Sequence, residues 1–156
     1  MSVEIALYQP EIPPNTGNIA RTCAVTGAKL HLIKPLGFSI DEKYVKRAGL
    51  DYWHLVDVTV HESLEAFLEV MKGRSLYFSS TKAKKLYTEL HYEEDAVLVF
   101  GSETRGLPAL IHENYQDGLM RIPMLDSKDA RSLNLSNAVA IVLFEALRQL
   151  EFPGLV

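Results

Sequence analysis

Polar residues that could bind a ligand or support catalysis are concentrated in three stretches of the sequence, residues 9–18, 101–107 and 122–134. Each stretch follows a short apolar run of the kind that forms a buried strand, and each precedes a segment with helical character. Turns of this kind expose backbone N–H groups, and the N-terminus of a helix favours a polar or anionic ligand. The three stretches are therefore the strongest candidates for a ligand-binding or catalytic site.

The stretch GSETRGLP (residues 101–108) follows the apolar run VLVF (residues 97–100) without a break. Its two glycines, five positions apart, predict a tight turn that exposes backbone N–H groups to a ligand. A P-loop would continue with Lys and then Ser or Thr after the second glycine, whereas Leu107 and Pro108 follow here, and G-x-G-x-x-G occurs nowhere in the chain. Binding of a nucleoside triphosphate through a P-loop is thereby excluded. An ordinary turn with a surface Glu and Arg remains the alternative.

The last of the three stretches ends in a group of hydrogen-bonding side chains at the start of a long apolar helix, predicted over residues 135–150. These side chains belong to Ser132, Asn134, Ser136 and Asn137. One such side chain is enough to cap the helix. The others would then have no structural task, so we expect some of them to contact a polar ligand.

The first stretch contains three prolines before a helix predicted over residues 17–26, with its N-cap at residues 15–16 and Gly27 just beyond its end. Asn18 and Arg21 are three positions apart and so share one face of that helix. An arginine close to a helix N-terminus opposes the helix dipole, which suggests that it serves a ligand. A solvent-exposed arginine with no such task is the alternative.

Composition narrows the classes of protein further. The 156 residues are 47% hydrophobic and 23% charged, with a formal net charge of −4, which is ordinary for one soluble domain. The longest unbroken apolar run covers only residues 138–144, so we expect no membrane span, and the N-terminus shows no secretory signal. The lone Cys23 leaves no disulfide and no cysteine-based zinc site, and we expect a buried structural thiol in a cytoplasmic protein.

The sequence contains no motif that indicates a metal site or a serine hydrolase. The five histidines have no metal-ligand spacing, and G-x-S-x-G is absent, so we expect neither a metal site nor a serine nucleophile. Nucleic-acid binding by this acidic chain would need local basic patches. The candidate patches are Lys43, Lys46 and Arg47, then Lys82, Lys84 and Lys85, then Arg105, Arg121, Lys128 and Arg131. A solvated face is the default interpretation of each, although several coincide with the polar stretches.

Six strands and five helices are predicted from hydrophobic periodicity and turn residues. The strands cover residues 3–8, 30–34, 55–60, 76–79, 96–100 and 119–122, and the helices cover 17–26, 41–48, 63–71, 108–114 and 135–150. Their alternation predicts one α/β domain over residues 1–156, with a mostly parallel sheet flanked by helices. Ligands of such sheets bind beyond the carboxyl ends of strands, where the three polar stretches fall.

Taken together, the three stretches resemble the three motifs of the SPOUT superfamily of RNA methyltransferases. They read PEIPPNTGNIAR (residues 10–21), LVFGSETRGLP (residues 98–108), and RIPM followed by RSLNLSNAV (residues 121–124 and 131–139). Their order, wording and spacing are similar to the single-domain branch that methylates the anticodon wobble nucleotide of tRNA. The likeness extends over essentially the whole chain and includes RAGLDY (residues 47–52).

That resemblance implies a fold in which the C-terminal segment passes through a loop to form a deep trefoil knot. It also implies the cofactor S-adenosyl-L-methionine. The residues that it assigns to cofactor binding are Ser79, Gly101, Ile122, Ser132 and Leu133. The implied reaction is methylation of the ribose 2′-hydroxyl of a cytidine or uridine in the tRNA anticodon stem-loop. A ribosomal RNA 2′-O-methyltransferase, or a non-catalytic module that binds a cofactor or RNA, is the alternative.

The resemblance makes Arg21 the central catalytic residue. A guanidinium is always protonated in proteins, so we expect Arg21 to hold the phosphate of the reacting nucleotide rather than to act as a general base. The residues expected to position the nucleotide and complete the site are Asn18, Glu103, Ser132 and Asn134. The resemblance further implies a homodimer joined through the helix of the first motif and the C-terminal helix, with each active site drawing on both chains.

Overall fold

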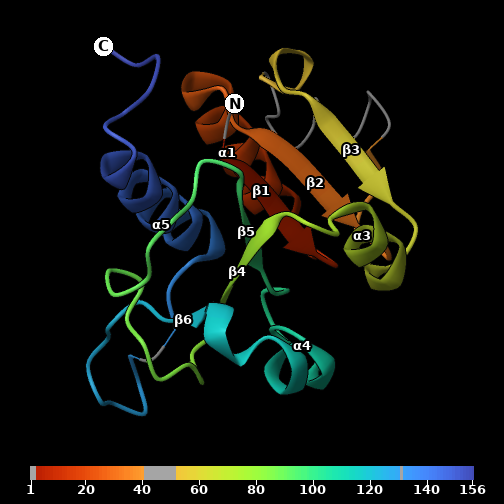
Figure 1. Cartoon of the computed structure of the whole chain (residues 1–156). Coiled ribbons are helices and arrows are strands. Elements are labelled where there is room, and N and C mark those ends of the chain that lie inside the picture. Colours follow the sequence, from red (N-terminus) through yellow and green to blue (C-terminus); the bar gives the residue numbers. More distant parts are fainter. Residues whose placement is uncertain (1–2, 41–51, 131) are drawn as a thin grey trace.

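A single parallel sheet organises the molecule. The computed structural model describes residues 3–40, 52–130 and 132–156. Six parallel strands in this part of the chain pair in the order β3-β2-β1-β5-β4-β6 (Figure 1). They are β1 (Glu4–Tyr8), β2 (Lys29–Ile33), β3 (Val58–His61), β4 (Ser75–Ser79), β5 (Ala96–Phe100) and β6 (Leu119–Met120). The predicted α/β fold class with a mostly parallel sheet is confirmed.

Helices cover both faces of this sheet. They are α1 (Pro13–Thr26), α3 (Leu64–Val70), α4 (Ala109–Asn114) and α5 (Leu135–Gln149), with short 3₁₀ turns η1 (Trp53–Leu55) and η2 (Gln116–Gly118). Alternate residues of a strand point to opposite faces, so Ile5 and Leu7 of β1 join the core beneath α1 and α5, whereas Ala6 joins the core beneath α3 and α4. Figure 1 shows α1 and α5 on one side of the sheet, and the two helices contact each other.

The start of α1 differs from the prediction. The helix begins at Pro13 with Ile12 as the N-cap, because proline has no N–H to lose at the first helical positions and its fixed φ suits a helix. Asn15 and Thr16, expected as the cap, lie buried in the first turn. Arg21 is consequently about two turns from the N-terminus, so it does not oppose the helix dipole, and that prediction was wrong.

Other boundaries moved less. The strand expected from residue 55 begins at Val58, since η1 occupies the preceding residues, and β6 ends at Met120 rather than at residue 122. Gly27 ends α1 with φ of 78°, and Asn134 caps α5 by accepting a hydrogen bond from the Ser136 N–H, as expected. The helix expected over 41–48 lies outside the described residues. The trefoil knot stays a prediction.

The sequence also predicts a buried Cys23 and no membrane-spanning segment. Cys23 is buried against the core, and this burial raises the pKa of its thiol to about 12, which confirms an unreactive structural cysteine. No helix within residues 3–40, 52–130 and 132–156 is long and apolar enough to cross a membrane.

Candidate active site

A cavity of about 480 Å³ opens at the carboxyl ends of β4, β5 and β6, beside the start of α5. Its lining draws on all three polar stretches and on a fourth, the segment that follows β4. Residues of its lining include Asn15, Ser79, Ser80, Lys82, Glu103, Arg105, Leu107, His112, Ile122, Ser132, Leu133 and Asn134. Such a volume lies within the range of about 300–1,000 Å³ for small-molecule sites.

The loop after β5 is a closed turn built on two glycines. Ser102 and Gly106 exchange two backbone hydrogen bonds of 3.3 and 3.0 Å, and Gly106 has φ of 68°. A Cβ on Gly101 would lie only 2.3 Å from the carbonyl carbon of Gly106, so no larger residue fits without moving the backbone. The tight turn predicted from the glycine spacing is confirmed, and Gly101 lines the cavity.

Glu103 anchors the chain segment that leads into α1. Its carboxylate accepts hydrogen bonds from the backbone N–H of Glu11 at 2.9 Å, the backbone N–H of Ile12 at 2.8 Å and the Asn15 side-chain amide at 3.3 Å. The attachment is reciprocal, because the Glu11 carboxylate accepts bonds from the hydroxyl and the backbone N–H of Thr104. These bonds from Thr104 hold the pKa of Glu11 below its usual range.

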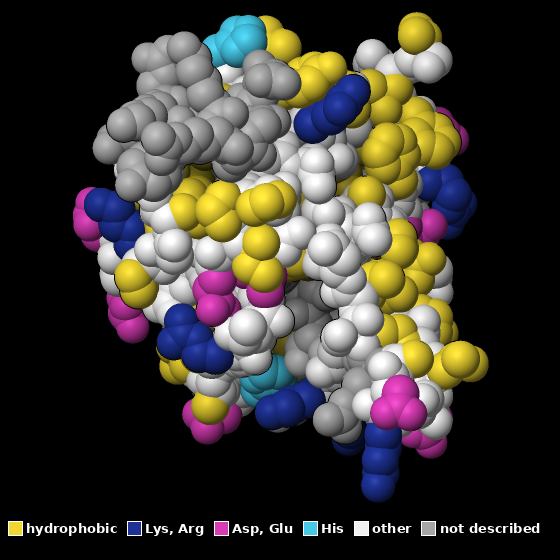
Figure 2. Space-filling view, turned by 180° about the vertical axis from the view of Figure 1, so that it is seen from behind, with side chains coloured by type: hydrophobic (Ala, Val, Ile, Leu, Met, Phe, Trp, Pro, Cys, Tyr) yellow, Lys and Arg dark blue, Asp and Glu magenta, His cyan; other side chains and the backbone are white. Residues whose placement is uncertain are grey.

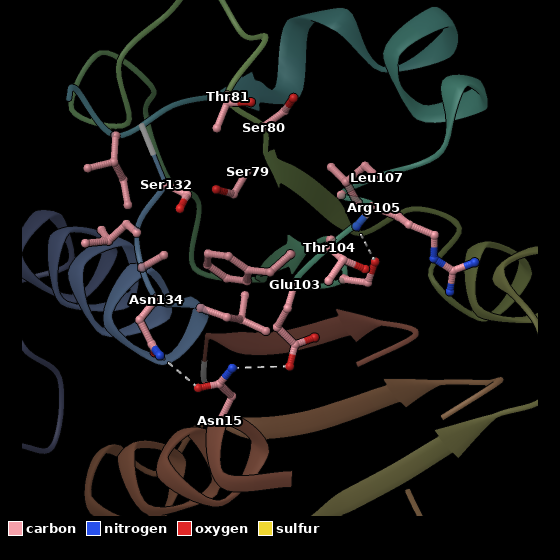
Figure 3. A pocket seen from close by; sticks show the side chains of 18 of the residues that line it. Asn15, Ser79, Ser80, Thr81, Glu103, Thr104, Arg105, Leu107, Ser132 and Asn134 are labelled. Atoms are coloured by element: carbon pink, nitrogen blue, oxygen red, sulfur yellow. Dashed lines mark hydrogen bonds between the residues drawn. The ribbon is translucent and has the colours of Figure 1, made fainter. Parts of the chain in front are cut away.

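Asn15 extends this connection to the third motif. Its side-chain oxygen accepts a hydrogen bond of 3.1 Å from the side-chain amide of Asn134, while its own amide donates to Glu103 (Figure 3). Asn134 also caps α5. One relay of three side chains, Glu103–Asn15–Asn134, therefore joins the first turn of α1, the loop after β5 and the cap of α5 along one wall of the cavity.

The five residues expected to bind a cofactor all line this cavity. They are Ser79, Gly101, Ile122, Ser132 and Leu133, and Figure 3 shows Ser79 and Ser132 from opposite segments facing the same space. Of the five residues expected to serve catalysis, Glu103, Ser132 and Asn134 also line it. The structure thus brings together eight of the ten assignments in one place, with Ser132 counted in both sets.

Asn18 and Arg21 lie elsewhere. Both are exposed on α1 and neither lines the cavity of its own chain. The Arg21 guanidinium stands over the Tyr52 ring, 4.9 Å from its centroid, which is the geometry of a cation–π contact. The two residues do share one helix face, as their spacing predicted.

Sequence reasoning missed several residues of the cavity wall. Asn15 was expected as the helix cap and Lys82 only as part of a basic patch, whereas Ser80 and His112 had no expected role, yet each lines the cavity. The signal for the segment after β4 was present, because SSTK (residues 79–82) follows an apolar strand in the same way as the other polar stretches do. His112 gave no such signal, since it lies within a helix.

Comparison with known proteins identifies the family. The model of the SpoU rRNA Methylase family matches residues 2–144. The chain belongs to this family. It is 49% identical over 155 residues to the tRNA (cytidine(34)-2′-O)-methyltransferase of Escherichia coli (strain K12), covering 99% of this chain and 98% of the relative.

Solved structures of SpoU family members share the fold. A structure described as "Structural insights into the 2-OH methylation of C/U34 on tRNA" has a TM-score of 0.88 and 44% identity, covering 96% of this chain and 97% of that one. An AdoMet-bound rRNA methyltransferase from Sinorhizobium meliloti has a TM-score of 0.82 and 27% identity, covering 96% of this chain and 57% of that one. The second is a longer protein, whereas the first matches this chain end to end.

The residues of the cavity fit S-adenosyl-L-methionine, the methyl donor of this family. Leu107, Ile122 and Leu133 offer apolar surface for a purine ring, serine hydroxyls suit a ribose, and Lys82 offers positive charge for a carboxylate. No group of three or more His, Cys, Asp or Glu in the described part of the chain could hold a metal ion.

Proposed function

We propose that this chain transfers a methyl group from S-adenosyl-L-methionine to the ribose 2′-hydroxyl of cytidine 34, the wobble nucleotide of tRNA. The observation that carries the proposal is the cavity in which all three motifs meet, in a chain whose relatives of matching length act on this nucleotide. When bound, the cofactor supplies a methyl group on a sulfonium centre, which is a good leaving group. The protein is left with two tasks, alignment of the hydroxyl and help with its proton.

Arg21 is proposed to hold the phosphate of the reacting nucleotide. The guanidinium stays protonated, so it binds a phosphate rather than accepting a proton. Asn18 lies on the same exposed face of α1 and would contact the same nucleotide. Glu103 acts by fixing the start of α1 through its bonds to Glu11 and Ile12, and thereby the position of Arg21. Ser132 and Asn134 complete the site from the third motif.

The position of Arg21 outside the cavity of its own chain supports a homodimer with shared active sites. In that assembly α1 and α5 form a two-fold interface, and Arg21 of one protomer reaches the cavity of the other. Exposed apolar side chains are available for such an interface, including Val25 on α1 and Ile141 and Phe144 on α5. Figure 2 shows hydrophobic side chains gathered along the right edge, on the side of the molecule that α5 forms.

The decisive experiment incubates the protein with labelled S-adenosyl-L-methionine and either total tRNA or ribosomal RNA, followed by mapping of the modified nucleotide. Label on the 2′-oxygen of nucleotide 34 of tRNA is the expected result. Label in ribosomal RNA would favour the family's other substrate class, which its description names. Absence of label with both RNAs, together with binding of S-adenosylhomocysteine, would identify a non-catalytic module. A cytoplasmic location accords with a tRNA anticodon stem-loop as the substrate.

A further inference from the structure

A second wall of the cavity is held by a pair of side chains with no assigned role, Ser80 and His112. The Ser80 hydroxyl lies 2.8 Å from Nε2 of His112, and both residues line the cavity. In Figure 3, Ser80 and Thr81 lie across the cavity from Asn15, which belongs to the Glu103–Asn15–Asn134 relay. The cavity is therefore tied by hydrogen bonds on two opposite sides.

The hydrogen-bond network assigns the donor and acceptor roles in this pair. Nδ1 of His112 lies 3.3 Å from the carbonyl oxygen of Pro108, and a carbonyl can only accept, so Nδ1 carries the proton. Nε2 is then the acceptor for the Ser80 hydroxyl. The oxygen of that hydroxyl accepts a 3.1 Å bond from the Lys82 N–H. Each imidazole nitrogen consequently has one defined partner, and the Ser80 hydroxyl has two.

These bonds fasten two separate parts of the cavity wall to one imidazole. Pro108 ends the turn that begins at Gly101, and Ser80 begins the segment that carries Thr81 and Lys82. The segment is closed by a further bond from the Ala83 N–H to the Ser80 carbonyl. Since Thr81 and Lys82 are themselves exposed, the bonds of Ser80 and the burial of Ala83 are what position them against the cavity.

We propose that His112 is a positioning residue for the cofactor: through the Ser80 hydroxyl it sets the wall formed by residues 79–82 and so determines the affinity for S-adenosyl-L-methionine. This inference rests on the proposed function only in the identity of the ligand. His112 acts through Ser80 and touches no reacting atom. Its loss changes the KM for the cofactor, while kcat at saturation and the KM for tRNA keep their wild-type values.

The test compares His112→Phe, which keeps a flat ring without either nitrogen, with His112→Gln, which keeps a side-chain acceptor for Ser80. Calorimetry with S-adenosylhomocysteine measures affinity without turnover, and initial rates at saturating tRNA give KM and kcat. We expect His112→Phe to weaken S-adenosylhomocysteine binding and raise the cofactor KM by about five- to tenfold, as expected for loss of one hydrogen bond. His112→Gln recovers most of this loss.

A double-mutant cycle separates positioning through Ser80 from a general effect on the fold. In a Ser80→Ala background, His112→Phe should weaken S-adenosylhomocysteine binding by less than about twofold further, because the two residues act as one unit. If His112→Phe does not fold, the same cycle is run with His112→Gln and its partial loss. His91→Phe, at an exposed position near Ser75 and so at the opposite end of β4 from the cavity, is the matched control and keeps wild-type affinity.

Two results would overturn the inference. One is wild-type affinity in folded His112→Phe, and the other is a full additional loss in the Ser80→Ala background. Failure of the proposed function is a distinct outcome, because it leaves wild-type protein unable to methylate tRNA whatever residue stands at position 112.

Discussion

The side-chain amide of Asn134 donates a hydrogen bond of 3.1 Å to the side-chain oxygen of Asn15, across 119 positions of sequence. Asn15 in turn donates to Glu103, so the first turn of α1, the loop after β5 and the cap of α5 are held as one unit. Asn15 is itself buried, which makes the relay costly to leave half satisfied. The relay consequently links the helix that carries Arg21 to the cavity in which the other site residues meet.

Removal of the Glu103 carboxylate should destabilise this unit. Glu103→Ala leaves the Glu11 and Ile12 N–H groups and the Asn15 amide without their acceptor. We expect the free energy of unfolding to fall by about 1–3 kcal/mol, measured by urea denaturation. Glu94→Ala, at an exposed position, should stay within about 0.5 kcal/mol of wild type. Equal stability of the two variants would show that the anchoring bonds contribute nothing.

The loop after β5 should tolerate an added methyl group at one glycine far better than at the other. Gly101→Ala places a Cβ 2.3 Å from the Gly106 backbone, so the turn must open. We expect a loss of about 3 kcal/mol or more in stability and at least tenfold in S-adenosylhomocysteine affinity. Gly106→Ala meets open space, and its cost is the strain of φ near 68°, about 1–2 kcal/mol. Affinity should distinguish them, because only the first displaces the cavity wall.

Much of this architecture could be predicted because it depends on local patterning. Apolar runs alternating with helical segments are sufficient to predict a parallel sheet, and the rule that ligands bind beyond strand ends pointed to the loops that line the cavity. The start of α1 could not be found in this way. Two prolines were interpreted as a turn before the helix, whereas at the first helical positions proline costs nothing.

The bonding partners within the site could not be predicted at all. Glu103 meets Glu11 because β1 pairs with β5 in a register that sets Leu7 opposite Phe100, so the loops that follow the two strands lie side by side. No sequence pattern encodes that register for residues about ninety positions apart. Ser80 and His112 meet for the same kind of reason, since α4 packs beside the end of β4.

Arg21→Ala should abolish methyl transfer and leave the fold intact. The Arg21 side chain is exposed, and its contact with Tyr52 contributes only about 0.5–1 kcal/mol. We expect kcat for tRNA methylation to fall at least about 100-fold, as when an electrostatic transition-state contact is removed, with S-adenosylhomocysteine affinity unchanged. Lys72→Ala removes another exposed cation and serves as the control. Wild-type turnover by Arg21→Ala would contradict the assignment.

Acid should weaken the fold at a buried cluster beneath α3. His31 lies 2.6 Å from Glu4 and 2.9 Å from His61, and all three are buried. Burial lowers the pKa of His61 below its ordinary value, and the adjacent His31 lowers it further. Burial would raise the pKa of Glu4, but hydrogen bonds from His31 and Arg74 outweigh it and lower that pKa.

Both shifts act in the same direction on stability. Below about pH 6.5 the unfolded chain binds a proton at His61 that the folded chain does not, so stability falls as pH decreases toward the folded pKa. Glu4 adds a second loss that begins near the ordinary pKa of a carboxyl group. Thermal unfolding between pH 8 and pH 5 should show a decreasing midpoint, and His61→Gln should flatten the part of this slope above pH 5. An unchanged slope in that variant would exclude His61 as the cause.

The shared-site dimer predicts that two variants with defects in different parts of the site restore each other. Arg21→Ala keeps an intact cavity, and Gly101→Ala keeps an intact Arg21. If Arg21 serves the cavity of its partner, random exchange of protomers makes half of the dimers mixed, and each mixed dimer holds one complete site. Activity should therefore return to about a quarter of the wild-type value. If Arg21 served its own cavity, no complete site would form and activity would stay absent.

The mixing experiment requires that the protein is a dimer. Sedimentation tests this requirement, because a dimer has a mass near twice 17.5 kDa. Co-purification of a tagged variant with its untagged counterpart confirms that protomers have exchanged, and each variant incubated alone gives the background.

Ile141→Asp on the exposed face of α5 offers an independent route to the same conclusion. A charge buried at an interface without a partner is costly, so this variant should become a folded monomer that binds S-adenosylhomocysteine. Since Arg21 then has no partner cavity to reach, tRNA methylation should be lost, and a monomer that still methylates tRNA would contradict the shared site.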